Sequence, residues 1–264
     1  MRILHIRNIA NYAFRLAQAQ RALGHEAVVW SHGDDYGFPY DELMPSGLKW
    51  NLWMMERWSQ VRDFDLLHIH GGIWPGQVFY RLKGLPAKAI HYHGGETRTG
   101  KGLYHKSVAG MHFYTPPDLR KWHPGGMWLP QPIDVPEMPE TFEHEKPLFV
   151  HFSTSETNKG TTKVIEMFNK AFGPLQGPLQ RDQKDFYIGK DAELWVFRQI
   201  PHEYVESVIL RADVVFDQIA SFGIYGYTSV EAMALGKPAL STIDRSLYPK
   251  DCPVIYPSAT KLVE

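Results

Sequence analysis

The sequence predicts an α/β fold with two doubly wound parallel-sheet domains. Short apolar runs alternate with segments of helical periodicity from the first residues onward, which is typical of βαβ units. This rhythm stops at a proline-rich stretch and then starts again, so it describes two sheets rather than one. We therefore expect an N-terminal domain over residues 1–134, a linker over residues 135–146 and a C-terminal domain over residues 147–264.

The N-terminal half contains one clear helix and five strand-like runs. Apolar residues recur at helical spacing over residues 11–24, and Gly24 is a typical helix stop. The strand-like runs are short and mostly apolar, as buried parallel strands are. They are RILHIR (2–7), EAVVWS (26–31), DLLHIH (65–70), AKAIHYH (87–93) and GMHFYT (110–115).

An aromatic cluster, NLWMMERW (51–58) with Trp50 before it, lies between the second and third of these runs. Packing into the core of the domain is the simpler interpretation of so many large apolar side chains. Contact with an acceptor substrate is the alternative, because aromatic rings also bind sugars and other flat ligands.

The linker is predicted from the stretch between Pro130 and Pro147, PQPIDVPEMPETFEHEKP. Five prolines deny this stretch a continuous helix, and its acidic residues leave few apolar anchors for a core. After it the alternation resumes. Strands are expected at 148–153, 193–198, 213–218 and 238–242, and helices at 161–173, 202–212 and 227–236. The segment GPLQGPLQRDQKD (173–185) is expected to be a surface loop.

Composition narrows the classes of partner and the compartment. Lys and Arg number 28 and Asp and Glu 29, so the net charge of −1 gives no general attraction to nucleic acid or anionic lipid. The single cysteine, Cys252, cannot form an internal disulfide, which fits a reducing compartment. No signal peptide pattern opens the chain and no run is apolar enough for a membrane span. We expect a cytoplasmic protein.

One loop and the helix after it suggest a ligand. In SFGIYGYTSVEAMALGKPAL (221–240), two glycines and two tyrosines precede an amphipathic helix that carries a single acidic residue, Glu231. A helix N-terminus attracts anions, and Gly223 and Gly226 let a ligand approach the backbone closely. Ligands of open α/β sheets bind at the carboxyl ends of the strands, so two such domains are expected to face a cleft. Phosphate at the loop and hydroxyls at Glu231 describe a nucleotide sugar.

The stretch GIYGYTSVEAMALGKPAL (223–240) resembles the signature of retaining glycosyltransferases of the GT-B fold, the group-one glycosyltransferases. The resemblance implies two Rossmann-like domains, with the nucleotide sugar held by the C-terminal one. It implies that Tyr225, Gly226, Tyr227 and Thr228 bind the donor diphosphate and sugar. It also implies that Glu231 binds the ribose hydroxyls.

Other stretches are similar to the same family. HFSTSETNKGTTKVIEMF (151–168) implies that Lys159 is the cation at the diphosphate. IPHEYVESVILRADVVFDQ (200–218) implies that Gln199 to His202, Ile200 among them, lie near the nucleotide base. IHYHGGETR (90–98) implies that His93 is the active-site histidine beside the transferred sugar. The N-terminal domain is then the acceptor-side domain.

The chain departs from the family in three places. Gly223 stands where the family has an acidic residue that contacts the sugar, and Thr154 stands where many members have a second phosphate-binding arginine. Arg98 or Arg198 would have to replace that arginine. The chain also ends at Glu264, before the helices that cross back onto the first domain in the family, which leaves a homo-oligomer open.

The sequence thus predicts an enzyme that transfers a hexose-type sugar from a nucleotide-diphosphate sugar to an acceptor hydroxyl, with retention implied by the resemblance. The donor is a substrate, and no further cofactor, metal ligand or nucleic-acid partner is expected. A non-catalytic nucleotide-sugar-binding protein of the same fold is one alternative. A metal-dependent hydrolase is the other, because residues two apart on a strand face the same side and can share a metal. Its ligands would come from the pairs His68/His70 and His91/His93.

Overall fold

The computed structural model describes residues 1–33, 36–47, 49–73, 76–98, 108–135, 142–181, 184–219 and 222–263. The chain divides into two compact units, residues 1–34 with 38–132 and residues 35–37 with 133–264. Of the linker expected over residues 135–146, residues 136–141 lie outside the described part. Among the described helices, none is both long and apolar enough to cross a bilayer.

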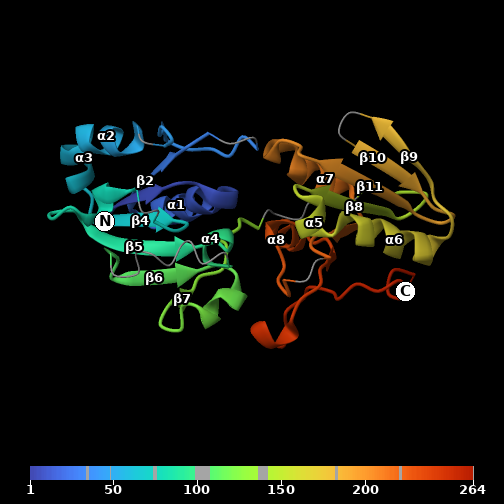
Figure 1. Ribbon diagram of the computed structural model, residues 1–264. Coiled ribbons are helices and arrows are strands. Elements are labelled where there is room, and N and C mark those ends of the chain that lie inside the picture. The colour runs from blue at the N-terminus through green and yellow to red at the C-terminus, as the bar shows by residue number, and fades with distance from the viewer. Residues whose placement is uncertain are drawn as a thin grey trace. The chain divides into compact units, whose positions relative to one another are not determined.

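The first unit is a seven-stranded sheet in the order β3-β2-β1-β4-β5-β6-β7, and every neighbouring pair is parallel (Figure 1). The first six positions follow the Rossmann order, so the doubly wound sheet expected from the sequence is confirmed. The five strand-like runs all form strands. The strands are β1 (Arg2–Ile6), β2 (Glu26–Ser31), β3 (Glu42–Leu43), β4 (Leu66–His70), β5 (Ala87–Tyr92), β6 (Met111–Tyr114) and β7 (Met127–Trp128).

The two faces of this sheet have different chemistry because successive side chains of a strand point to opposite sides. On β1, Leu4 and Ile6 belong to the larger apolar core, whereas Ile3 packs with Ala13 and Ala17 of helix α1. Helix α1 spans Tyr12–Ala22, close to the range expected. His5 alternates with Leu4 and Ile6 and therefore lies on the α1 face, where four more histidines join it.

The aromatic cluster after Trp50 packs into the core, which confirms the simpler interpretation for its inward members. It forms helices α2 (Lys49–Glu56) and α3 (Trp58–Arg62). Trp50 and Met54 are buried with β1 and β4 side chains, and Trp53 lies edge-on to Trp30 with 5.0 Å between ring centroids. Leu52, in contrast, is exposed.

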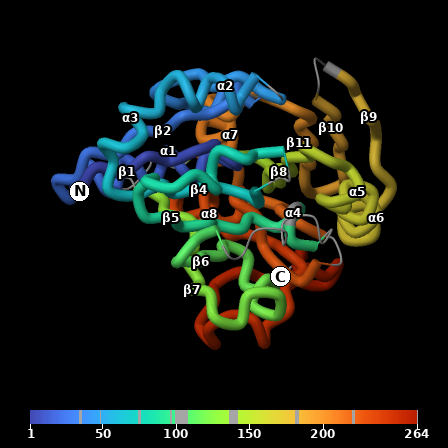
Figure 2. Tube along the Cα trace, turned by 60° about the vertical axis from the view of Figure 1, so that its left-hand side comes forward, coloured from blue at the N-terminus to red at the C-terminus, as the bar shows by residue number. Residues whose placement is uncertain are grey.

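The second unit is a six-stranded sheet in the order β13-β12-β8-β11-β10-β9. The four strands from β13 to β11 are parallel to one another, and β10 and β9 form an antiparallel hairpin beside β11. Figure 2 shows β10 and β9 at one edge of this unit, next to β11. The strands are β8 (Leu148–Ser153), β9 (Gln176–Arg181), β10 (Lys184–Ile188), β11 (Glu193–Arg198), β12 (Val214–Phe216) and β13 (Ala239–Leu240).

The prediction of a surface loop over residues 173–185 is wrong, because most of this segment forms β9 and the start of β10. The segment has no apolar alternation, and Gly177 and Pro178 are typical turn residues. An edge strand tolerates both, since one side of its backbone needs no partner. Gly177 is also required here, because a Cβ atom at this position would lie 2.5 Å from the carbonyl oxygen of Phe186.

Helices cover both faces of the second sheet. Val164 and Phe168 of α6 pack on Phe149 of β8, whereas Val205 of α7 and Ala232 of α8 pack on the opposite face with Val150. The helices expected at 161–173, 202–212 and 227–236 are therefore confirmed. The helical elements of this unit are α5 (Glu156–Lys159), α6 (Thr161–Phe172), η5 (His202–Tyr204), α7 (Val205–Arg211), α8 (Tyr227–Ala234) and η6 (Arg245–Leu247). Those not yet named in the first unit are η1 (Ile9–Asn11), η2 (Val78–Arg81), α4 (Gly95–Arg98) and η4 (Pro117–Lys121).

His151 of β8 is a buried polar link between the sheet and α6. Its Nδ1 lies 3.1 Å from the carbonyl oxygen of Phe216 and its Nε2 lies 3.1 Å from Oγ1 of Thr161. Burial lowers the pKa of His151 to about 4, against a partial opposing effect of the Phe216 carbonyl. The ring is therefore neutral in the folded protein at neutral pH.

We predict that His151 makes folding weaken as the pH falls. Below pH 6.5 His151 of the unfolded chain binds a proton, whereas His151 of the folded chain stays neutral down to about pH 4. The stability that the neutral ring contributes is therefore complete above pH 6.5 and is lost as the pH falls towards 4. The loss from this residue should be about 2 kcal/mol between pH 7 and pH 5. Denaturant unfolding of the parent and of His151→Leu at both pH values measures it. An equal pH slope in the two proteins would contradict the assignment.

Candidate donor site in the second unit

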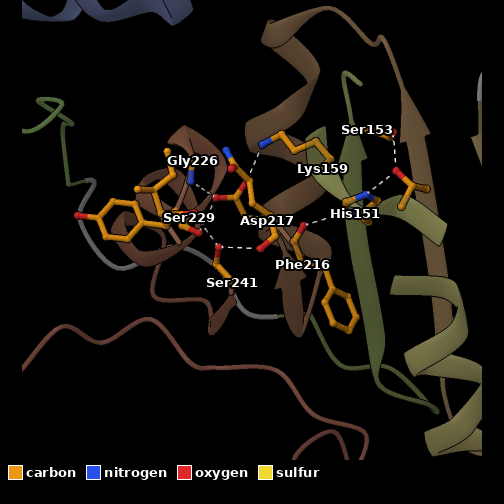
Figure 3. Close-up of polar contacts among 12 residues, drawn as sticks. His151, Ser153, Lys159, Phe216, Asp217, Gly226, Ser229 and Ser241 are labelled. Atoms are coloured by element: carbon orange, nitrogen blue, oxygen red, sulfur yellow. Dashed lines mark hydrogen bonds and ion pairs between the residues drawn. The ribbon is translucent and has the colours of Figure 1, made fainter. Parts of the chain in front are cut away.

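A buried ion pair joins three elements at the carboxyl end of β12 (Figure 3). Asp217 directly follows β12, and its Oδ1 accepts a hydrogen bond of 2.6 Å from Nζ of Lys159 at the end of α5. The Asp217 side chain is fully buried and that of Lys159 is 12% exposed. Gly160, with a φ of 70°, turns the chain between α5 and α6 and so fixes where Lys159 lies.

The other carboxylate oxygen of Asp217 binds the start of α8. Oδ2 accepts a hydrogen bond of 2.5 Å from the backbone N–H of Gly226 and one of 2.7 Å from the hydroxyl of Ser229. Burial alone would raise the pKa of Asp217, but the charge of Lys159 and these hydrogen bonds outweigh burial and hold the pKa below its usual range. Asp217 is therefore an ionised carboxylate at the start of α8.

Gly226 is required by this contact. A Cβ atom there would lie 2.9 and 3.0 Å from the two carboxylate oxygens of Asp217 and 2.7 Å from the side-chain nitrogen of Gln218. Its φ is −95°, so crowding rather than conformation explains the glycine. The sequence predicts a close approach at Gly226, and in the structure Asp217 makes one.

Glu231, one turn into α8, pairs with a histidine from the adjacent element η5. Oε1 of Glu231 lies 2.5 Å from Nε2 of His202, and the two side chains are 11% and 20% exposed. The ring of His202 stacks over that of Tyr227, with centroids 6.2 Å apart. The predicted ribose ligand is thus mostly buried, and its partner is a residue that the resemblance implies near the nucleotide base.

The remaining predicted donor residues surround these two clusters. The Tyr225 backbone N–H donates a hydrogen bond of 3.2 Å to the hydroxyl of Tyr248, and the two rings stack with centroids 4.7 Å apart. Thr228 lies in the first turn of α8 and is half-buried, and Ile200 packs against the core on the α7 and α8 face. Lys159, Gly226, Tyr227 and Glu231 therefore lie in one unit, as the resemblance implies.

Both arginines proposed to replace the missing phosphate ligand are paired with carboxylates. Arg98, in the first unit, donates hydrogen bonds of 2.9 and 2.8 Å to the two carboxylate oxygens of Asp118. Arg198 donates to Asp185 and, at 3.0 Å, to Glu156. Their positive charges are largely compensated within the protein, so neither provides the excess charge that a second phosphate cation would.

His93, the predicted active-site histidine, belongs to a layer of five histidines on the α1 face of the first sheet. His5, His68, His70 and His91 are buried and His93 is half-buried. Neighbouring rings stack, for example His68 on His70 with centroids 4.5 Å apart. Tyr12 of α1 covers the layer and lies 5.0 Å from the ring of His93.

Two sets of three histidines in this layer have ligand nitrogens within 4.8 Å of one another, as a metal site requires. They are His5, His68 and His70, and His70, His91 and His93. Burial holds the pKa of His68, His70 and His91 well below the usual range, so these rings are neutral, which is the form of imidazole that binds a metal. Both sets consist of histidines alone, so no carboxylate ligand would compensate the charge of a bound dication.

Sequence reasoning missed Asp217 and Ser229 as parts of the site, and it placed His202 near the nucleotide base without pairing it with Glu231. Asp217 stood in the predicted strand end DVVFDQ, and an acidic residue just after a buried strand is a usable signal. Ser229 carries no such signal, because a serine in a helix is ordinary. Its role depends on which elements become neighbours.

Comparison with known proteins establishes the fold. No protein-family model matches the chain, and no curated protein matches its sequence. An α-glucosyltransferase in complex with UDP and a 13-mer DNA matches with a TM-score of 0.59 and 13% identity, over 91% of this chain and 78% of that one. The catalytic domain of starch synthase IV from Arabidopsis thaliana, bound to ADP and acarbose, has a TM-score of 0.61 and 10% identity, over 97% and 86%.

A third structure, Anabaena HepE in complex with UDP and glucose, matches with a TM-score of 0.60 and 14% identity, over 91% of this chain and 80% of that one. At such low identity the likeness concerns the fold alone. The two Rossmann-like units and these matches agree, and the chain has the GT-B fold.

We predict strong coupling between Lys159 and Asp217. Lys159→Met or Asp217→Asn alone should lower the free energy of unfolding by about 3 kcal/mol, because each leaves a buried charge without its partner. The double variant should lose about 2 kcal/mol less than the sum of the two. Denaturant unfolding of the four proteins measures the coupling.

The matched control is the exposed Lys163 of α6. Lys163→Met should be nearly neutral and additive with Asp217→Asn, since it removes a lysine of the same neighbourhood that is solvated. Additivity of Lys159→Met and Asp217→Asn would show that the ion pair does not stabilise the unit.

Proposed function

We propose that this protein is a glycosyltransferase that moves a sugar from a nucleotide-diphosphate sugar to an acceptor hydroxyl. The observation that supports this proposal best is the loop and helix start at Gly226 to Glu231, where a lysine, backbone N–H groups and a buried carboxylate lie in one unit. Two of the similar structures contain UDP and one contains ADP, which are the leaving groups of such a transfer.

The proposed mechanism follows from where charge develops. The departing diphosphate gains negative charge as the glycosidic bond breaks, and donors aimed at that charge lower the barrier. Lys159 and the first N–H groups of α8 at Tyr227 and Thr228 would meet it. Lys159 keeps further N–H bonds beyond the one given to Asp217, because an ammonium has three.

Glu231 would accept hydrogen bonds from the ribose hydroxyls and so orient the donor, without taking part in bond cleavage. His93 is proposed to contact the transferred sugar. Transfer with retention, and a hexose as the sugar, are the finer parts of the proposal and come from the resemblance of residues 223–240.

The alternative, a protein that binds nucleotide sugars without turning them over, draws support from Asp217. This carboxylate compensates Lys159 and occupies the N–H of Gly226, while Arg98 and Arg198 are also paired. Less stabilisation is then left for a leaving diphosphate. The hydrolase alternative is weaker, since neither candidate set of ligands includes a carboxylate that would compensate the metal charge.

A single panel separates transfer from binding. Thermal unfolding is followed with each nucleoside diphosphate and nucleotide sugar, since a ligand that binds the folded state raises the Tm. The same mixtures are then assayed for sugar transfer and for release of the nucleoside diphosphate. A raised Tm with no product for any acceptor mixture favours the binding protein, and product formation establishes the transferase.

We predict that Glu231→Ala weakens binding of the donor found in the panel by about 1 to 3 kcal/mol, because the ribose hydroxyls lose a charged acceptor. Isothermal titration calorimetry with the nucleotide sugar measures the Kd. Glu206→Ala is the control, since Glu206 is an exposed glutamate on the neighbouring helix α7 and should leave the Kd unchanged. An unchanged Kd for Glu231→Ala with every donor would end the ribose assignment.

We also predict that transfer needs no divalent metal, because a lysine and helix N–H groups meet the diphosphate charge. Dialysis against a strong chelator should leave the rate unchanged, with metal content measured before and after. The hydrolase alternative expects the reverse, since its bound water needs a zinc-like ion. A transition metal at about one per chain whose removal abolishes activity would overturn the transferase.

A further inference from the structure

A histidine of the second unit engages one of the two carboxylate oxygens of Glu231. Oε1 of Glu231 lies 2.5 Å from Nε2 of His202. An ionised carboxylate can only accept, so the imidazole donates this hydrogen bond. The other oxygen, Oε2, has no hydrogen-bond partner among the described residues, and the Glu231 side chain keeps 11% of its surface exposed. Glu231 therefore offers a ligand two unequal acceptors.

Contacts other than the one with Glu231 hold His202 in place. Its backbone N–H donates a hydrogen bond of 3.0 Å to the carbonyl oxygen of Tyr36, in a segment that belongs to the second unit. Its ring stacks on that of Tyr227, with centroids 6.2 Å apart and ring planes inclined by 15°. The backbone and the ring are thus both anchored, so the imidazole stays on Oε1 when the hydroxyls of a ligand reach Glu231.

The two oxygens matter because a ribose presents two neighbouring hydroxyls, at its 2′ and 3′ positions. A carboxylate with both oxygens open binds such a pair with one hydroxyl on each oxygen, and each bond is strong because the acceptor is charged. At Glu231 only Oε2 is open in this way. A second hydroxyl would have to share Oε1 with the short hydrogen bond from His202. One hydroxyl therefore gains most of what this carboxylate offers.

We propose that His202 is a positioning residue that makes the donor site tolerant of 2′-deoxyribose. By holding Oε1, it leaves Glu231 a single open oxygen that either ribose hydroxyl can satisfy. The site then binds ribonucleotides and 2′-deoxyribonucleotides alike, and it rejects a nucleotide that lacks both hydroxyls. This inference rests on the proposed function, because it needs the ribose at Glu231, and it extends the donor class to 2′-deoxynucleoside diphosphate sugars.

A purely structural role of the pair has a different consequence. If the hydrogen bond between His202 and Glu231 only joined η5 to α8, its loss would change the stability of the unit and its affinity for every nucleotide by the same factor. The ratio of the affinities for a ribonucleotide and its 2′-deoxy form would then stay constant. This ratio is therefore the quantity to measure.

Isothermal titration calorimetry of the intact protein with UDP and ADP, and with their 2′-deoxy and 2′,3′-dideoxy forms, measures this tolerance. We expect the Kd of the 2′-deoxy form to lie within roughly 3-fold of that of the ribo form. The dideoxy form should bind about 10-fold more weakly or worse, because it leaves Oε2 without a donor. A 2′-deoxy form that is itself weaker by about 10-fold would overturn the proposal, and so would a dideoxy form that binds as well as the others.

Two variants of His202 separate the hydrogen bond from the ring. His202→Phe keeps an aromatic ring over Tyr227 and removes the donor, so Oε1 becomes open to the second hydroxyl. The penalty for the 2′-deoxy form should then rise to about 10-fold. His202→Gln keeps an N–H donor of similar reach and should retain the ratio of the parent. Equal ratios in the parent and in His202→Phe would overturn the positioning role.

Glu203→Gln is the matched control, since Glu203 is exposed on the same turn as His202 and should leave every ratio unchanged. Each ratio compares two forms of one nucleotide on the same folded protein, so a general loss of affinity cancels. The ratios of the parent decide the question even where a variant does not fold.

The two proposals fail separately in this experiment. If the parent binds ribonucleotides and 2′-deoxyribonucleotides alike but transfers no sugar in any mixture of the panel, the tolerance stands and the transferase does not. If sugar is transferred and the 2′-deoxy forms are rejected, the transferase stands and the tolerance falls. Absence of binding for every nucleotide would end both.

Discussion

The carboxylate of Asp217 is the interaction on which the second unit depends most. One fully buried group joins the end of α5 through Lys159, the loop before α8 through the Gly226 N–H, and α8 itself through Ser229. These elements are far apart in the sequence, and an ionised carboxylate without them would be very costly in the interior. The backbone links the same two segments, because the N–H of Ile219 donates a hydrogen bond of 3.0 Å to the carbonyl oxygen of Lys159. The arrangement of the candidate donor site is therefore fixed before any ligand arrives.

In this same interaction, the negative charge of Asp217 compensates the positive charge of Lys159. Lys159 and the Gly226 N–H are groups that would bind a diphosphate, and an internal anion already satisfies both. A ligand phosphate would have to share these donors with Asp217 rather than meet them unpaired. The proposed enzyme thus relies on the remaining N–H bonds of Lys159 and on the helix start. That limited excess charge is also what gives the non-catalytic alternative its physical support.

The first unit has the opposite character, because its polar layer contains imidazoles held neutral by burial. Their nitrogens mostly satisfy one another and a few side chains such as Gln20 and Thr115. Within the described residues, Nε2 of His68 and Nδ1 of His91 have no hydrogen-bond partner. Desolvation explains why these rings are poor bases.

The sequence by itself determined the two doubly wound sheets, since alternating apolar runs and helical periods reflect local geometry that a single segment carries. Residues 26–31 and 148–153, for instance, form strands over the ranges predicted from their apolar runs. It also placed Lys159, Gly226 and Glu231 in the segments that follow the carboxyl ends of strands in one sheet. Only the tertiary structure decided what these residues touch. The partners Asp217 and His202, the edge strand at residues 176–181 and the layer of histidines all depend on which elements pack side by side. Such contacts join residues up to 65 positions apart, as His5 and His70 are, and no local pattern encodes a distance of that kind.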